Sequence, residues 1–172
     1  MNIYIKAFFF LLSFSLFHFG YEVTQWSFLA PFCGVNESVF QHMKMAFWGY
    51  ILLSIIEYFW IQKKIKQKIV NFFYSRALST IILPWITIVL WYLLPALYGR
   101  AESLIIDLLW AIFVTYISAL FVIQIEKEVE KNRFHIGTKI AILILLVISA
   151  FLFVWFTYNL PWLDLFENPA NI

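Results

Sequence analysis

The chain has 172 residues, of which 63% are hydrophobic and 13% are charged, and its mean hydropathy is +0.84. Soluble domains carry roughly 25% charged residues, so this composition excludes a water-soluble globule. A net charge of +2 gives no reason to expect a nucleic-acid partner, and the single cysteine, Cys33, excludes an internal disulfide. Long apolar runs also exclude a transmembrane barrel, whose strands alternate apolar and polar residues.

Five apolar runs are long enough to cross a membrane, which takes about 20 residues each. They predict an all-α bundle, a single transmembrane domain over residues 1–172, with helices near 3–21, 39–61, 77–98, 103–125 and 137–158. No small residues suited to signal-peptide cleavage follow the first run, so we expect it to remain as a helix. Residues 22–38 are too polar for a further span and predict a loop, either re-entrant or closing over the bundle as a lid. The lipid bilayer is the first expected partner.

The basic residues predict the orientation, because Lys and Arg collect on the cytoplasmic side. With a cytoplasmic N-terminus, only Lys44 and Arg100 of the twelve lie outside. The other ten lie on the inner side: Lys6, Lys63, Lys64, Lys66, Lys68, Arg76, Lys127, Lys131, Arg133 and Lys139. The sequence therefore predicts N-in, C-out.

Charged residues near the inner boundary have structural explanations. Glu57 lies near the inner end of the second helix, where we expect it to pair with Arg76 or a neighbouring lysine. We interpret the basic residues of the loop 62–76 as determinants of the membrane orientation. The alternative is that they bind an anionic ligand or a lipid headgroup. Residues 126–133 alternate in charge and predict a solvated continuation of the fourth helix with local ion pairs.

The outer third of the protein collects polar residues that a membrane makes costly, by several kcal/mol for a charge at the centre of a helix. These candidate ligand-binding residues are His18, Glu22, Asn36, Glu37, His42 and Asp107. Shared hydrogen bonds would lower their cost, so we expect one pocket on the extracytoplasmic side. His18 and Glu22 share one helix face and suit either a metal or an acid–base pair, although hydration at the interface explains them equally well.

The second helix begins within this set. Ser38 and Gln41 form a capping-box pattern, and Asn36 is the alternative cap. His42 points about 140° away from Glu37 on a regular helix, so Glu37 can join it only from an irregular first turn. Lys44 is close enough to the outer surface to extend its ammonium group toward water.

The stretch 36–44 and the C-terminal stretch 156–169 resemble a family of small bacterial integral membrane proteins classed as a domain of unknown function. This resemblance covers nearly the whole chain and implies a membrane fold, with no established activity. In that family Trp usually stands at the position of Phe40, Glu at Gln41, and often a His near Trp162. The departures here remove two candidate ligands, which weakens the case for a metal site.

No phosphate-binding loop, nucleophile elbow or HExxH motif is present, so the sequence names no enzyme class or cofactor. The first hypothesis is a membrane protein that binds or transports a small ligand or ion in an outward-facing polar pocket. The second is an accessory subunit whose polar residues dock a partner helix. The third is an intramembrane enzyme that uses a metal or acid–base pair on a lipid-like substrate. Whether a metal is bound stays open.

Overall fold

A computed structural model describes residues 1–65, 68–99 and 103–168 of the chain. These residues form an all-helical fold with five helices long and apolar enough to cross a membrane, which confirms the predicted fold class. The long helices are α1 (Ile3–Thr24), α2 (Val39–Ile65), α3 (Ile69–Trp91), α5 (Leu104–Glu130) and α6 (Ile136–Tyr158). The short elements are η1 (Ser27–Leu29), α4 (Leu93–Tyr98) and η2 (Asp164–Phe166).

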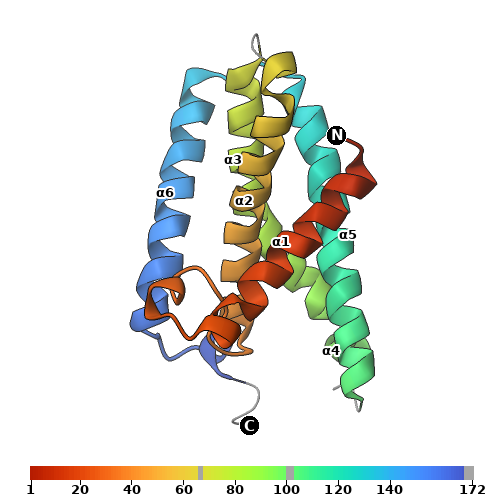
Figure 1. Ribbon diagram of the computed structural model, residues 1–172, viewed down its shortest axis with the longest axis vertical. Coiled ribbons are helices and arrows are strands. Elements are labelled where there is room, and N and C mark those ends of the chain that lie inside the picture. The colour runs from red at the N-terminus through yellow and green to blue at the C-terminus, as the bar shows by residue number, and fades with distance from the viewer. Residues whose placement is uncertain (66–67, 100–102, 169–172) are drawn as a thin grey trace.

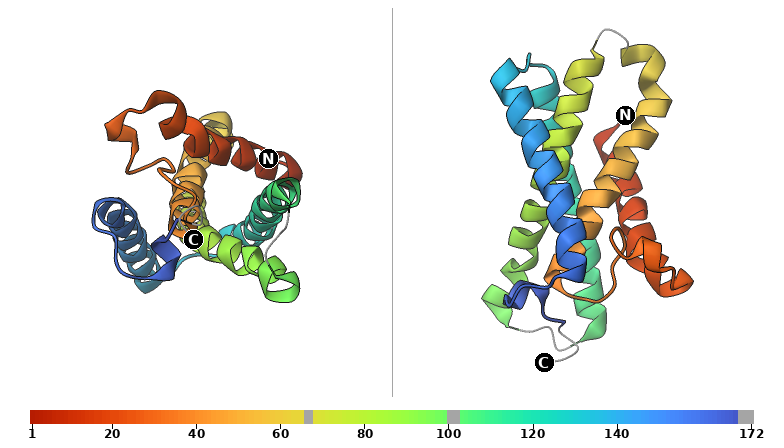
Figure 2. Two further views of the ribbon diagram at one scale, coloured as in Figure 1. Left: turned by 90° about the horizontal axis from the view of Figure 1, so that it is seen from below. Right: turned by 90° about the vertical axis from the view of Figure 1, so that its left-hand side faces the viewer.

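The helices form an upright bundle that α1 crosses obliquely (Figure 1). Helix α3 packs against α2, α5 and α6, whereas α1 packs against α2 and α5. We call the end that carries the loop 25–38 and the C-terminus the lower end, and the end that carries the α2–α3 and α5–α6 turns the upper end (Figures 1 and 2). Both candidate clusters described below bridge α1 and α2, one toward each end.

The crossing of α1 over α2 depends on a glycine. A Cβ atom on Gly49 would lie 3.3 Å from the backbone nitrogen of Phe14, closer than side chains ordinarily approach a backbone. Around this crossing the buried side chains of α1, α2 and α5 form the main core, which includes Phe10, Tyr50 and Ile123. A second core, with Phe47 and Phe153 inside it, joins α2 to α6.

The predicted helix near 77–98 begins earlier, at Ile69, and is interrupted at Tyr92. Proline explains the interruption, because Pro95 has no N–H to donate to the carbonyl four residues before it. That carbonyl, of Trp91, instead accepts a hydrogen bond from the indole Nε1 of Trp110 on α5, at 3.1 Å. The short helix α4 follows the break and lies at the lower end (Figure 1).

Candidate metal centre

The loop between α1 and α2 begins and ends with specific backbone conformations. Gln25 adopts the left-handed conformation (φ 54°) and its N–H donates to the carbonyl of Tyr21, which ends α1. At the other end the side-chain oxygen of Asn36 accepts from the N–H of Ser38 at 2.9 Å, just before α2 begins. Asn36 therefore forms a turn that leads into α2, which begins at Val39. The side chain of Gln41 accepts from the N–H of Val35 at 3.4 Å, not from Ser38 as a capping box requires.

A second contact holds the loop against α1. The N–H of Gly34 donates to the carbonyl of Phe17 at 3.0 Å, so the chain returns to α1 immediately before α2. A Cβ on Gly34 would lie 2.7 Å from the sulfur of Met45, so a larger residue here would require the side chain of Met45 to shift. This return places Glu37, in the bend before α2, beside the last turns of α1.

Three of the six predicted site residues converge here. The Oε2 atom of Glu37 lies 3.7 Å from Nε2 of His18 and 3.5 Å from Nε2 of His42. The two imidazole rings are 5.5 Å apart between centroids, and one ligand atom from each residue lies within 4.8 Å of the others. Glu37 reaches His42 from outside the regular helix, as the angular argument required.

The protonation of His42 follows from its other ring nitrogen. Nδ1 lies 2.9 Å from the carbonyl oxygen of Ser38, and because a carbonyl only accepts, Nδ1 carries the hydrogen. In the neutral ring Nε2 then presents a lone pair to the carboxylate of Glu37. At 3.5 Å that contact is longer than a hydrogen bond, for which 2.7–3.2 Å is usual. A proton or a cation between Nε2 of His42 and the carboxylate of Glu37 would therefore complete this contact.

The distances suit a metal ion better than a direct pair. Ligands about 2.0–2.2 Å from a tetrahedral Zn²⁺ lie roughly 3.3–3.6 Å from one another, close to the separations between Glu37 and the two histidines. Two imidazoles and a carboxylate form a donor set common for Zn²⁺ and other first-row transition metals. The bond from His42 Nδ1 to a backbone carbonyl is the usual outer-shell support of a histidine ligand.

Aromatic rings surround the imidazoles on their inner sides. Trp91 stacks on His42 with ring centroids 6.0 Å apart, and Phe19 lies 4.8 Å from the ring of His18. Phe14 contacts both imidazoles. Each histidine side chain is 24% exposed, whereas Glu37 is 61% exposed. The cluster is thus apolar on its inner side and open on the side of the carboxylate.

The remaining predicted residues lie outside this donor cluster. Glu22 is exposed, and its main-chain carbonyl accepts from the side chain of Gln25. Asp107, in the first turn of α5, is exposed and interacts electrostatically with His42. Arg100, considered at the sequence level as an outer basic residue, lies outside the described residues.

Lys44 is directed toward this end but does not reach water. It is fully buried, and its ammonium group donates to the carbonyl of Ala30 at 2.7 Å and to the hydroxyl of Thr157 at 3.2 Å. The expectation of a hydrated ammonium group was wrong, because the loop folds over the side chain and supplies its acceptor. Lys44 thereby connects the loop to α6 on the inner side of the His18–Glu37–His42 cluster.

A second cluster, which sequence reasoning largely missed, lies toward the upper end. The ammonium group of Lys6 binds the carboxylates of Glu57, at 2.6 Å, and Glu126. Arg76 binds Glu57 through two nitrogens at 3.2 Å each and also reaches Glu130. The structure thus confirms the predicted pairing of Glu57 with Arg76. We call Lys6, Tyr50, Glu57, Arg76, Glu126 and Glu130 the buried ionic network.

The network explains why Glu126 leaves the solvated segment expected for residues 126–133. Its side chain is buried and its Oε2 accepts a 2.6 Å hydrogen bond from the hydroxyl of Tyr50. The expectation of a solvated position was wrong for Glu126, whereas exposed Lys131 and Glu128 do form the local pair. One available signal was Lys6 itself, a lysine inside an apolar helix that lacks an acidic residue nearby in sequence.

The profile of a family of unknown function, DUF6512, matches residues 1–171. The chain belongs to this family. The match confirms the expectation of an uncharacterised family that covers nearly the whole chain. No curated protein matches the chain, and no solved structure matches it. Within DUF6512, the assignment of a function to this chain therefore depends on the two clusters themselves.

Proposed function

We propose that this chain is a multi-pass membrane protein that binds a transition-metal ion of the Zn²⁺ class at its lower end. His18, Glu37 and His42 are the ligands. The observation that carries the proposal is the convergence of two imidazoles and one carboxylate, with Glu37 Oε2 at 3.7 and 3.5 Å from the two Nε2 atoms and one ligand atom from each residue within 4.8 Å of the others. Because Nδ1 of His42 carries the hydrogen that binds Ser38, Nε2 has none to donate to the carboxylate, and the cation joins these two groups instead.

The proposed orientation places this site on the extracytoplasmic side. Lys6 and Arg76 are buried in ion pairs, so they are not free loop charges. The other inner-side basic residues fall, by sequence, at or beside the upper turns: Lys63, Lys64, Lys66, Lys68, Lys127, Lys131, Arg133 and Lys139. The positive-inside rule then makes the upper end cytoplasmic and the metal site outward-facing.

Binding is favoured over a permanently open ion pathway. Between the metal site and the buried ionic network the core holds Phe10 and Leu53, both fully buried. These side chains close the bundle on the side of the histidines that faces the upper end, whereas exposed Glu37 leaves the site accessible from the lower end. An ion therefore enters and leaves on one side in this conformation.

A second candidate function is metal-dependent catalysis on a lipid-like substrate. Three protein ligands leave one position open around a tetrahedral ion, as in catalytic zinc sites, where water or substrate takes the fourth place. The open position would lie beside Glu37, at the exposed side of the site. Metal binding is the requirement shared by both candidates and is tested first.

The test measures Zn²⁺ binding to the purified full chain in detergent, after treatment with a chelator, by competition with a chromogenic chelator. We expect one tightly bound ion per chain. His18→Ala, His42→Ala and Glu37→Gln should each weaken binding by more than about 100-fold, since even outer-shell changes cost 10- to 100-fold. Glu37→Gln is the safest variant because this side chain is exposed.

The chain offers matched controls for each ligand type. His135, the third histidine, is exposed at the start of α6 near the upper end, and Glu22 is an exposed carboxylate at the lower end. His135→Ala and Glu22→Gln should leave the affinity unchanged. Equal losses in these controls, or a wild-type chain that takes up no Zn²⁺, would refute the proposal. Affinity should fall as the pH is lowered, because protonated imidazoles cannot bind the ion.

A further inference from the structure

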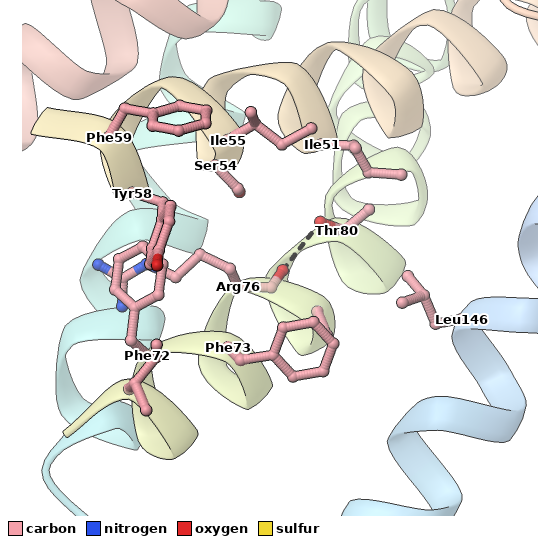
Figure 3. Close-up of a pocket in the computed structure, with 12 residues that line it drawn as sticks. Ile51, Ser54, Ile55, Tyr58, Phe59, Phe72, Phe73, Arg76, Thr80 and Leu146 are labelled. Carbon is pink, nitrogen blue, oxygen red and sulfur yellow. Dashed lines mark hydrogen bonds between the residues drawn. The ribbon is translucent and has the colours of Figure 1, made fainter. Parts of the chain in front are cut away.

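An apolar groove opens between α2 and α3 in the upper half of the bundle (Figure 3). Its volume is about 430 Å³, within the range of 300–1,000 Å³ typical of ligand sites. Helix α2 contributes residues from Ile51 to Phe59, α3 contributes residues from Ile69 to Thr80, and Leu146 of α6 lines one side. The groove lies far from the metal site, which is at the opposite end of α2.

Three of the polar side chains in the groove wall already have partners. Ser54 donates its hydroxyl to the carbonyl of Tyr50, and Thr80 donates to the carbonyl of Arg76, the bond drawn in Figure 3. The guanidinium of Arg76 binds Glu57 and Glu130 in the buried ionic network. These side chains already donate their hydrogen bonds within the protein, so the groove lining favours an alkyl chain over a polar ligand.

The dimensions of the groove fit one leaflet of a bilayer. From Ile51 to Phe59 the helix rises about 12 Å, compared with about 15 Å for half of a typical hydrocarbon core. Ile55, Phe59 and Phe73 are about half exposed or more, so the bundle itself leaves this wall uncovered. Helix α6 packs on α2 lower down, through Phe153, and does not close the groove there.

Basic residues occur in the sequence at the ends of the two helices that form the groove. Positions 63 and 64, both lysine, fall in the last turn of α2, and exposed Lys68 directly precedes α3. The sequence holds no acidic residue from Tyr58 to Ala101. Lys68 makes no side-chain cap to α3, whose positive dipole end therefore adds to the field of the lysines. Basic clusters beside membrane helices attract anionic headgroups by about 1 kcal/mol per residue.

We propose that this groove binds an anionic phospholipid, with one acyl chain between α2 and α3 and the headgroup beside Lys64 and Lys68. The apolar lining selects the chain, and the lysines select the headgroup charge. The bound acyl chain would fill the space beside Leu146 that α6 does not cover. The lipid thus belongs to the leaflet at the upper end and is independent of the proposed metal site.

Native mass spectrometry of the full chain, released from micelles that contain equal amounts of phosphatidylglycerol and phosphatidylcholine, tests this proposal. We expect one phosphatidylglycerol to remain bound to the wild-type chain. Ser54→Phe should remove it by filling the groove. Ser15→Phe is the matched control, because Ser15 is also half-buried on a membrane helix and also donates to the carbonyl four residues before it.

A second pair of variants separates the chain site from the headgroup site. Lys64→Gln/Lys68→Gln should reduce the preference for phosphatidylglycerol over phosphatidylcholine by about 25-fold, at about fivefold per lysine. This double variant should still retain some bound lipid. Ile55→Trp should block the groove from an exposed position if Ser54→Phe fails to fold. Full lipid retention by the groove-filling variants, equal loss in Ser15→Phe, or a dimer that buries the groove in place of lipid would overturn the proposal.

Discussion

Replacement of Lys6 by Met should strongly destabilise the protein. Lys6 is 2% exposed and neutralises Glu57 and Glu126 together. Without it, Arg76 is left as the one cation for three carboxylates of the network. Removal of one partner from a buried ion pair costs about 3–5 kcal/mol, and two carboxylates lose a partner here, so we expect the upper part of that range.

The size of the effect differs among the network members for a physical reason. In Glu57→Gln, Lys6 keeps Glu126 and Arg76 keeps Glu130, so each cation retains a carboxylate. We expect a smaller loss, of about 3 kcal/mol. In the double variant Lys6→Met/Glu126→Gln, one positive and one negative group disappear together, so much of the loss caused by Lys6→Met should be recovered.

Unfolding of the purified protein in detergent, followed by circular dichroism against increasing SDS, measures these free energies. Lys131→Met is the matched control, since Lys131 pairs with Glu128 at an exposed site where such pairs contribute about 0–1 kcal/mol. A loss for Lys6→Met no larger than that of Lys131→Met would refute the reasoning. So would a double variant that is less stable than Lys6→Met, because removal of the second charge would then add to the damage.

Two further predictions concern the orientation and the cysteine. In a background that lacks Cys33, cysteines introduced at Lys66 and Asn168 should react with an impermeant maleimide from opposite sides of the membrane, and labelling of both from one side would contradict the N-in, C-out arrangement. Burial raises the pKa of the Cys33 thiol above its ordinary value of 9.0, against the smaller opposing effect of Lys44. Iodoacetamide at pH 8 should therefore modify Cys33 more slowly in the folded protein than in SDS, and the contribution of the neutral thiol to stability should decline as the pH rises above 9.0.

The sequence predicted the features that depend on neighbouring residues. Apolar runs marked the five helices, and the Ser38–Gln41 pattern, with Asn36 as the alternative cap, placed the start of α2 next to its observed first residue, Val39. Of the polar residues expected to share one pocket, the structure brings His18, Glu37 and His42 together. Their common position near the ends of apolar runs was enough to group them.

The sequence could not predict contacts made across long separations. Lys6 meets Glu57 across 51 positions and Glu126 across 120, and Tyr50 meets Glu126 across 76. Only the packing of α1 against α2 and α5 brings these groups together. Glu126 also continues a helix whose next residues are solvated, so its local pattern indicated exposure, whereas the tertiary structure buries it.

The two clusters join the same pair of helices at different heights. Helix α1 carries Lys6 and His18, and α2 carries Glu57 and His42, so the ion pairs at one end and the histidines at the other both connect α1 to α2. Since the helices also touch closely at Gly49, between the clusters, a rotation of α1 about this contact would move His18 relative to His42. The buried ionic network resists that rotation, because it would separate Lys6 from its carboxylates. The distance between the two histidines, on which the proposed metal binding depends, is thus set in part by charges at the far end of the bundle.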